Sequence, residues 1–212
     1  MERIIATGTI RATVAAMLAL LALLALAASA AAAEQPECVK CHAPIVAHKV
    51  VHGAVQIGCQ ACHANLDAST TPHRSTGSAP KGLAAEPPAL CMNCHESKLF
   101  EGKVVHGPVA AGLCTTCHDP HGSDNNAMLA KSGAALCLGC HPDVKKKPHV
   151  IVGFGGGGHP LGDVAKATPV MDPLRPSRAF YCAACHEPHR SDLPALTRFP
   201  RGMTSCQNCH KK

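Results

Sequence analysis

Apolar residues are distributed unevenly along the 212-residue chain. Two arginines within the first eleven residues precede an uncharged run of 22 residues, Ala12–Ala33, that is rich in Ala and Leu. A basic segment followed by an apolar run and by small residues is typical of a secretory signal peptide. The run ends in two small-x-small triplets of the kind that signal peptidase accepts. We therefore predict that residues 1–33 are a signal peptide and that the mature chain begins near Glu34.

The same run is long enough to span a bilayer, so an uncleaved N-terminal anchor is the alternative. The Ala-rich composition and the two cleavage triplets favour removal of the segment. A lipoprotein anchor is not expected, because the first cysteine, Cys38, stands several residues after the run. The predicted location is periplasmic or extracellular.

The remainder, residues 34–212, is poor in the large apolar side chains that usually fill a core. The whole sequence has four Phe, one Tyr and no Trp, and its 46% hydrophobic content is raised by the signal peptide, by Ala and by Cys. Small domains without such a core rely on disulfides, metals or covalent cofactors. We predict a mostly irregular chain with short α-helices, Pro- and Gly-rich loops and little or no β-structure.

All fourteen cysteines form seven Cys-x-x-Cys pairs, and His follows each pair directly. Cys-x-x-Cys-His is the attachment signature of c-type haem, in which two thiols bond to one porphyrin and His binds its iron. Disulfide frameworks, zinc ribbons and thioredoxin-like sites also use paired cysteines, but none requires His at this place. We predict a haem-filled core with seven covalent haems c. The attachment cysteines are Cys38, Cys41, Cys59, Cys62, Cys91, Cys94, Cys114, Cys117, Cys137, Cys140, Cys182, Cys185, Cys206 and Cys209.

The fifteen histidines suffice for two axial ligands on every iron. The predicted proximal ligands follow the cysteines: His42, His63, His95, His118, His141, His186 and His210. The candidate distal ligands are the other eight: His48, His52, His73, His106, His121, His149, His159 and His189. Bis-His ligation leaves no open coordination position, which favours an electron carrier over an enzyme. The alternatives are a nitrite- or hydroxylamine-type oxidoreductase, which needs a vacant or weakly ligated iron, and a membrane-anchored quinol-oxidising cytochrome.

Two short elements recur between the motifs. Lys49–Gly53 and Lys103–Gly107 share the sequence KVVHG and precede the second and fourth motifs, and a Pro-His element follows the second, fourth and sixth motifs. These repeats predict two-haem units at about 34–80, 81–130 and 131–192, followed by a single haem motif at 193–212. The third unit contains a long Gly-rich segment, Pro148–Tyr181, read either as a partner-docking loop or as a tolerated insertion.

The order of these elements suggests which distal histidine serves which haem. By position along the chain, His52 and His106 would serve motifs two and four, His73, His121 and His189 would serve motifs three, five and seven, His48 the first, and either His149 or His159 the sixth. A crossed pairing, in which a histidine serves a spatially adjacent haem, is equally compatible with the spacing.

Between Val105 and His141, the run HGPVAAGLCTTCHDPHGS followed by LCLGCH resembles the doubled CXXCH multihaem cytochromes. The resemblance extends more loosely over residues 38–210. It implies a periplasmic or extracellular carrier whose partners are other redox proteins, such as cytochromes and quinol-oxidising or terminal reductase complexes, or an extracellular electron acceptor. No nucleic acid partner is expected. Association with a membrane is expected only if the N-terminal segment is retained. The formal net charge of +6 says little about the surface, because seven haems would add fourteen propionates.

Overall fold

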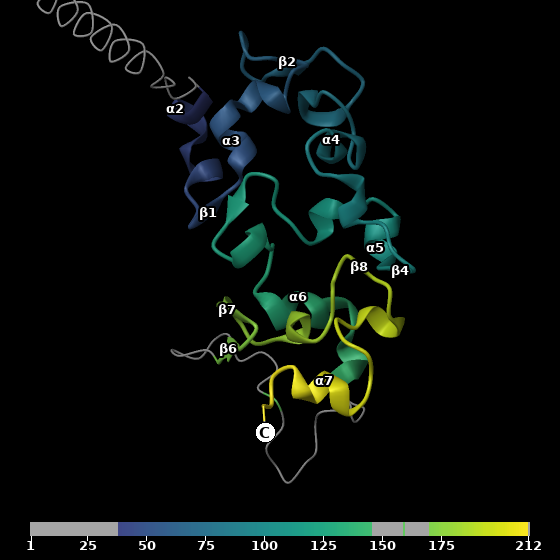
Figure 1. Ribbon diagram of the computed structural model, residues 1–212. Helices are drawn as coiled ribbons and strands as arrows, with labels where there is room; N and C mark the ends of the chain where they lie inside the picture. Colours follow the sequence, from purple (N-terminus) through teal and green to yellow (C-terminus); the bar gives the residue numbers. More distant parts are fainter. Residues whose placement is uncertain (1–37, 146–158, 160–169, 212) are drawn as a thin grey trace, which may run out of the picture. The chain divides into compact units, whose positions relative to one another are not determined.

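The computed structural model of the protein describes residues 38–145, 159 and 170–211 (Figure 1). The chain divides into two units, Met1–Lys40 and Cys41–Lys212, and the contacts described below lie within the second. The predicted signal peptide, residues 1–33, and the candidate ligand His149 lie outside the described residues. Within the described part of the chain, no helix is long and apolar enough to cross a membrane.

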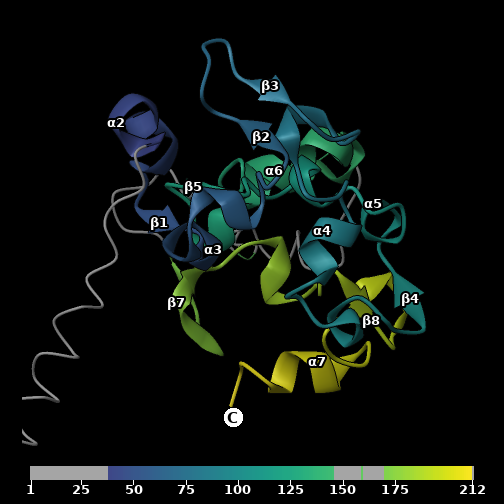
Figure 2. The ribbon, with the colours of Figure 1, turned by 90° about the horizontal axis from the view of Figure 1, so that it is seen from above.

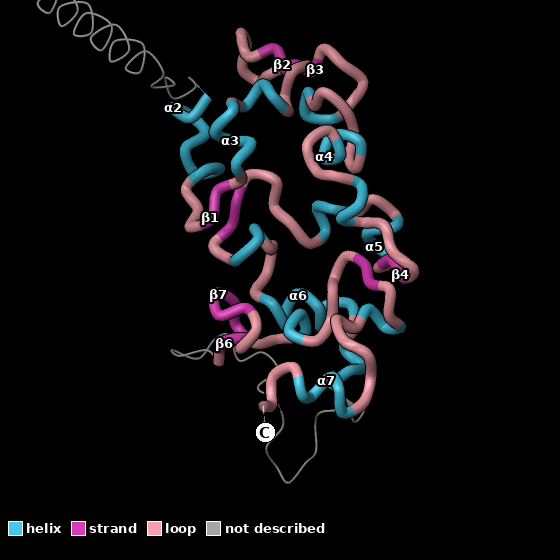
Figure 3. Tube along the Cα trace, in the orientation of Figure 1, coloured by secondary structure: helices cyan, strands magenta, loops and turns pink. Residues whose placement is uncertain are grey.

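The helices of the described residues are short and are separated by loops (Figure 3). The α-helices are α2 (Cys38–His42), α3 (Gly53–Ile57), α4 (Ala89–Met92), α5 (Gly107–Ala110), α6 (Gly133–Cys140) and α7 (Met203–Gln207). The 3-10 helices are η1 (Ala43–Val46), η2 (Cys59–Ala61), η3 (Pro80–Gly82), η4 (Ser97–Leu99), η5 (Cys114–Thr116), η6 (Asn126–Met128), η7 (Pro142–Lys145), η8 (Cys182–Ala184) and η9 (Pro194–Leu196). The prediction of short helices in a mostly irregular chain is confirmed.

The strands of the described residues form four small antiparallel pairs. These are β1 (Val50–Val51) with β5 (Gly122–Ser123), β2 (Leu66–Asp67) with β3 (Arg74–Ser75), β4 (Val104–Val105) with β8 (Arg190–Ser191), and β6 (Met171–Asp172) with β7 (Arg175–Ala179). Figure 2 shows β1 beside β5, although the two are far apart in the sequence. The β-structure, expected to be little or none, is therefore present as short pairs.

Two of these pairs join consecutive repeats. The KVVHG element supplies β1 and β4, and the Pro-His element of the following repeat supplies their partners β5 and β8. The backbone N–H of His52 donates to the carbonyl of His121 at 2.9 Å, and the N–H of His106 donates to the carbonyl of His189 at 3.0 Å. Histidines from neighbouring repeats are thereby brought to the same place in the fold.

Side chains alone bury little apolar surface in the described residues. The buried hydrophobic residues are Ala79, Ala134, Phe180, Ala183 and Ala184, and no large side chain there is fully buried. Several exposed apolar residues stand just before attachment cysteines: Ile57 is 75% exposed, Leu113 52% and Met203 72%. Apolar side chains thus gather where the sequence predicts haem, and not in a protein core.

Candidate haem sites

The seven attachment motifs lie on short helices of two kinds. Motifs one, three, five and seven begin on the α-helices α2, α4, α6 and α7, whereas motifs two, four and six begin on the 3-10 helices η2, η5 and η8. In motifs two to seven, the N–H of the motif histidine donates to the carbonyl of the first cysteine at 2.8–3.0 Å. This hydrogen bond closes one turn of backbone between the first cysteine and the histidine of each motif.

Among the described residues, six predicted proximal histidines face a second imidazole. The pairs are His42 with His73, His63 with His121, His95 with His52, His118 with His189, His141 with His106, and His210 with His159. Their ring centroids are 5.8–6.1 Å apart. Two imidazoles bound at about 2.0 Å on opposite sides of one metal ion have centroids roughly 6 Å apart. The residues therefore fit an iron with two axial histidines.

The imidazoles are arranged in pairs, and the number of ligands at a site limits which metal it can hold. The described residues contain no group of three or more His, Cys, Asp or Glu that could hold a metal ion by itself. None of the fourteen cysteines forms a disulfide in the structure. Two opposed imidazoles supply what a porphyrin leaves open on its iron, namely the two axial positions.

The partners are not those suggested by the order along the chain. His52 faces His95 of motif three and not the histidine of motif two. His121 faces His63 of motif two and not the histidine of motif five. The order-based assignment is wrong here because strand pairing between repeats, and not proximity in sequence, decides which imidazoles meet.

The same correction applies to the other order-based assignments. A histidine of a KVVHG element faces the next odd-numbered motif, as His106 does at His141. A Pro-His histidine of the second or third repeat faces the even-numbered motif of the preceding repeat, as His189 does at His118. The Pro-His histidine of the first repeat, His73, faces motif one.

Two candidate ligands have other positions than expected. His159 faces His210 of motif seven, so it does not serve motif six. His48, expected to serve motif one, lies beside Asp124, with its Nδ1 3.9 Å from the carboxylate. It is held there because the N–H of the next residue, Lys49, donates to that carboxylate at 3.0 Å.

A backbone carbonyl orients each histidine of motifs two, four and six. The Nδ1 of His63 lies 2.9 Å from the Lys81 carbonyl. The corresponding distances are 2.8 Å from His118 to Ala127 and 2.8 Å from His186 to Ala195. A carbonyl only accepts hydrogen bonds, so Nδ1 carries the proton and Nε2 keeps its lone pair for a metal.

The residues that present these carbonyls have left-handed backbones. The φ angles are 57° at Lys81, 55° at Ala127 and 54° at Ala195. This conformation costs a residue with a side chain roughly 1–2 kcal/mol. Such strain persists where the surrounding structure requires it, most often at functional sites. The sequence did not reveal the turns at Ala127 and Ala195, because Ala is not a turn signal.

Two distal candidates are oriented in the same way. The Nδ1 of His52 donates to the Pro120 carbonyl at 2.8 Å, and that of His73 donates to the Thr70 carbonyl at 2.8 Å. Burial lowers the pKa of His121 and of His189 below the usual value. Both imidazoles are therefore neutral near pH 7, which is the form that binds a metal.

The cysteine sulfurs of consecutive motifs lie near one another. Hydrogen bonds join Cys91 of motif three to Cys114 of motif four, and Cys137 of motif five to Cys182 of motif six. The second bond lowers the pKa of Cys182 to about 7. Further thiols have a neighbour in the adjacent motif that raises their pKa: Cys62 acts on Cys91, Cys140 on Cys117, and Cys209 on Cys185. Motifs two to seven therefore follow one another in space in chain order.

A sequence model described as a doubled CXXCH motif matches residues 48–100, 106–146 and 175–212, which together make up more than half of the chain. Each matched range contains one even-numbered motif and the odd-numbered motif that follows it. No curated protein matches the chain. The two-haem units predicted from the repeats, with their different boundaries, stay a prediction.

Proposed function

Because the chain belongs to the doubled CXXCH family of multihaem c-type cytochromes, we propose that it is an electron carrier with seven covalent haems. The observation that carries the proposal is the set of six imidazole pairs with centroids 5.8–6.1 Å apart. Axial histidines on both sides of an iron leave no position for a substrate. An iron ligated in this way exchanges electrons and does not bind and transform a small molecule.

When bound, each haem supplies an iron that alternates between the ferric and ferrous states. The fourteen cysteines would hold the haems by thioether bonds, and the paired imidazoles would ligate their irons. The carbonyls of Lys81, Ala127 and Ala195 keep the Nε2 atoms of motifs two, four and six directed at the metal. For motif six, we assign His149 as the distal ligand, and His48 as the histidine to spare.

The neighbouring sulfurs support a row of haems in chain order. Each attachment site from motif two to motif six has a sulfur beside the next site. Haems held at these neighbouring sulfurs would lie close to one another, and each would pass electrons to the next. The row has an entry end and an exit end, at which soluble redox proteins, a quinol-oxidising complex, a terminal reductase or an extracellular acceptor exchange electrons with it.

Haem counting tests the proposal. The denatured holoprotein, isolated from a host with haem-attachment machinery, should retain seven haem masses on one chain. Thioether bonds survive denaturation, whereas non-covalent haem dissociates. A purified mature protein with zinc, or with disulfides and no haem, would overturn the proposal.

Paramagnetic resonance separates the carrier from an enzyme. The oxidised protein should contain only low-spin ferric haem, because every iron has two histidine ligands. A stoichiometric high-spin haem together with reduction of nitrite or hydroxylamine would support the oxidoreductase alternative instead.

Fractionation tests the proposed location outside the cytoplasm. Cleavage of residues 1–33 releases a periplasmic or extracellular protein that begins near Glu34. Carbonate-resistant membrane association with Met1 retained would support the anchored, quinol-oxidising alternative.

A further inference from the structure

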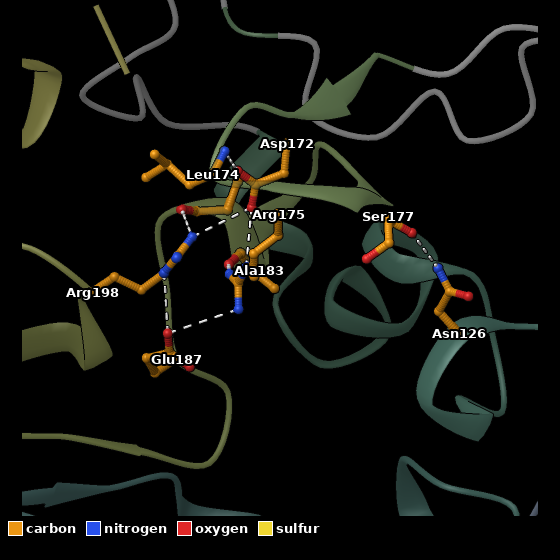
Figure 4. A network of polar contacts seen from close by, with 9 residues as sticks. Asn126, Asp172, Leu174, Arg175, Ser177, Ala183, Glu187 and Arg198 are labelled. Atoms are coloured by element: carbon orange, nitrogen blue, oxygen red, sulfur yellow. Dashed lines mark hydrogen bonds and ion pairs between the residues drawn. The ribbon is translucent and has the colours of Figure 1, made fainter. Parts of the chain in front are cut away.

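A network of ion pairs surrounds the attachment loop of motif six (Figure 4). At its centre is Asp172, which is only 2% exposed. Its carboxylate accepts hydrogen bonds from Arg175 Nε at 3.2 Å and from Arg198 Nη1 at 3.4 Å. The N–H of Leu174 donates to the same carboxylate at 2.9 Å. Burial opposes ionisation of Asp172, but these donors together hold its pKa below the usual value.

Both guanidinium groups also reach the loop between the two attachment cysteines. Arg175 Nη2 donates to the carbonyl of Ala183, and Arg198 Nη1 donates to the carbonyl of Ala184 at 2.8 Å. Ala183 and Ala184 are the two residues between the cysteines of motif six, and each is 6% exposed. The arginines therefore stand between the loop and the buried carboxylate, with their cationic groups against the loop.

The other even-numbered motifs have the same backbone without these charges. The N–H groups of Ala84, Ala130 and Arg198 each donate to the carbonyl of the second cysteine of their motif, at 2.8, 2.9 and 2.9 Å. The three residues are thus structural equivalents, and only the third carries a charge. Asp172 and Arg175 come from the hairpin β6–β7, within the long segment that distinguishes the third unit.

Motif four is the closest comparison for the charge difference. An acidic residue follows the motif histidine in both cases, Asp119 in motif four and Glu187 in motif six. Glu187 pairs with Arg198 Nε at 3.1 Å. Motif six has two further cations and one further anion, a net difference of one positive charge. A positive charge near an iron stabilises the ferrous state relative to the ferric state.

The hairpin β6–β7 and the residue just before motif six also contact residues of the second repeat and of α6. The side-chain amide of Asn126 donates to the carbonyl of Ser177 at 3.2 Å. The ring of Tyr181, directly before motif six, packs on Gly133 so closely that a Cβ there would lie 2.7 Å from it. Held at both sides, β6–β7 is a fixed support and not a loose insertion.

We propose that Asp172, Arg175 and Arg198 are positioning residues for the sixth haem: they fix the attachment loop through its two carbonyls and raise the reduction potential of this haem above that of the fourth. The proposal rests on the proposed function. Arg198 and Arg175 act on the loop directly, and Asp172 acts through them. The effect is local to motif six, because the guanidinium groups touch no other attachment loop among the described residues.

Potentiometric titration of the holoprotein tests the proposal through single substitutions. Arg198→Ala installs the residue found at the equivalent places in motifs two and four, so the backbone tolerates it. One of the seven one-electron transitions should then move to lower potential. In the Arg198→Lys variant, which keeps the positive charge, that transition should stay close to its wild-type potential. Arg178→Ala is the matched control, because it removes an exposed cation from β7, the strand that carries Arg175, at a position with no hydrogen bond to the loop among the described residues. An equal shift in that control would overturn the proposal.

Asp172→Asn separates positioning from charge alone. Removing a negative charge would by itself raise the potential of a nearby haem. If Asp172 acts by holding the arginines on the loop, the same transition falls, or the mass decreases by one haem because attachment fails there. Seven haems with an unchanged or raised transition would overturn the proposal. A wild-type protein without haem would show no transition at all, which would overturn the proposed function itself.

Discussion

Motifs two, four and six begin on 3-10 helices, whereas motifs one, three, five and seven begin on α-helices. On an α-helix, residues three and four positions apart share a face, so in motifs one and five, where α2 and α6 extend to the second cysteine or beyond it, the helix itself places the two cysteines and the histidine on one side. In the even-numbered motifs a carbonyl from a left-handed turn fixes the imidazole. Within the described residues, no such carbonyl bonds to the odd-numbered motif histidines. One class is oriented by its own helix, and the other by a turn later in the chain.

The third unit differs from the first two in the contacts that support its even-numbered motif. Motif six has the same 3-10 helix and the same left-handed turn as motifs two and four. Its additional support comes from an ion network that the insertion supplies. The shared backbone orients the histidine, and the inserted hairpin adds the ion pair of Asp172 and Arg175 beside Arg198. The two features can therefore be changed separately.

The most severe change removes the haems from both classes of motif. We expect protein with all fourteen cysteines replaced by Ser to be largely disordered and rapidly proteolysed. Ordering each residue costs roughly 1–2 kcal/mol of backbone entropy, and the five hydrophobic residues buried in the described part of the chain recover little of it. Circular dichroism and amide exchange measure the outcome. A cooperative, protected apo-fold would show that the helices and turns stand without the cofactor.

The next largest effect distinguishes motif six from the other even-numbered motifs. Asp172→Asn should lower the unfolding free energy of the holoprotein by about 3 kcal/mol, because it leaves two guanidinium groups without their buried partner. The folded-state pKa of Asp172 is lowered, so its stabilisation is full above the unfolded pKa of about 3.9 and is lost as the pH falls through the folded pKa. Denaturant titrations at pH 7 and at pH 3 should therefore show a smaller gap between wild type and variant at pH 3. An equal gap at both values would contradict the assigned ion pair.

A smaller effect tests the turn that defines the even-numbered class. Ala127→Pro is incompatible with the φ of 55° at this position, so the variant should lose roughly 2 kcal/mol of stability. The carbonyl that accepts from His118 is then displaced. The imidazole donates less electron density to the iron, and the potential of the fourth haem should rise.

Ala127→Gly is the control, because glycine adopts this φ without strain and keeps the carbonyl in place. Its stability should remain within about 0.5 kcal/mol of the wild type, since relief of strain and the entropy of glycine offset each other. A potential shift in the glycine variant equal to that of the proline variant would mean that the hydrogen bond is not responsible.

These turns also show which features can be predicted from the sequence and which cannot. The attachment cysteines, the ligand types and the short helices follow from the motifs themselves, because the chemistry of haem attachment fixes the spacing. The turns at Ala127–Met128 and Ala195–Leu196 have no glycine, although both residues of each turn have positive φ. Only the first repeat, with Gly82, carries a recognisable signal. Tertiary contacts impose the conformation in the other two repeats.

The pairing of the imidazoles could not be predicted from the sequence either. The repeats provide enough histidines in register, but the strand pairs that join consecutive repeats have only two residues each. Strands of that length leave almost no hydrophobic pattern from which a register can be inferred. The crossed arrangement was thus one of two open alternatives until the strands were placed.

The smallest expected effect is on the paramagnetic resonance signals, and it does not follow the division into odd- and even-numbered motifs. The imidazole planes are within 25° of parallel at motifs two, three and five, and 44–68° apart at motifs one, four and seven. Parallel axial imidazoles separate the iron d orbitals more than crossed ones do. Paramagnetic resonance of the oxidised protein should therefore resolve two kinds of low-spin signal, and a single kind would contradict the ring angles.

The crossed pairing is tested most directly by the iron positions in a crystal structure of the holoprotein, located by anomalous scattering. The account predicts an iron between His118 and His189 and another between His63 and His121, each about 2.0 Å from the two Nε2 atoms. An iron that instead joins His189 to the histidine of motif seven, or His121 to that of motif five, would contradict it.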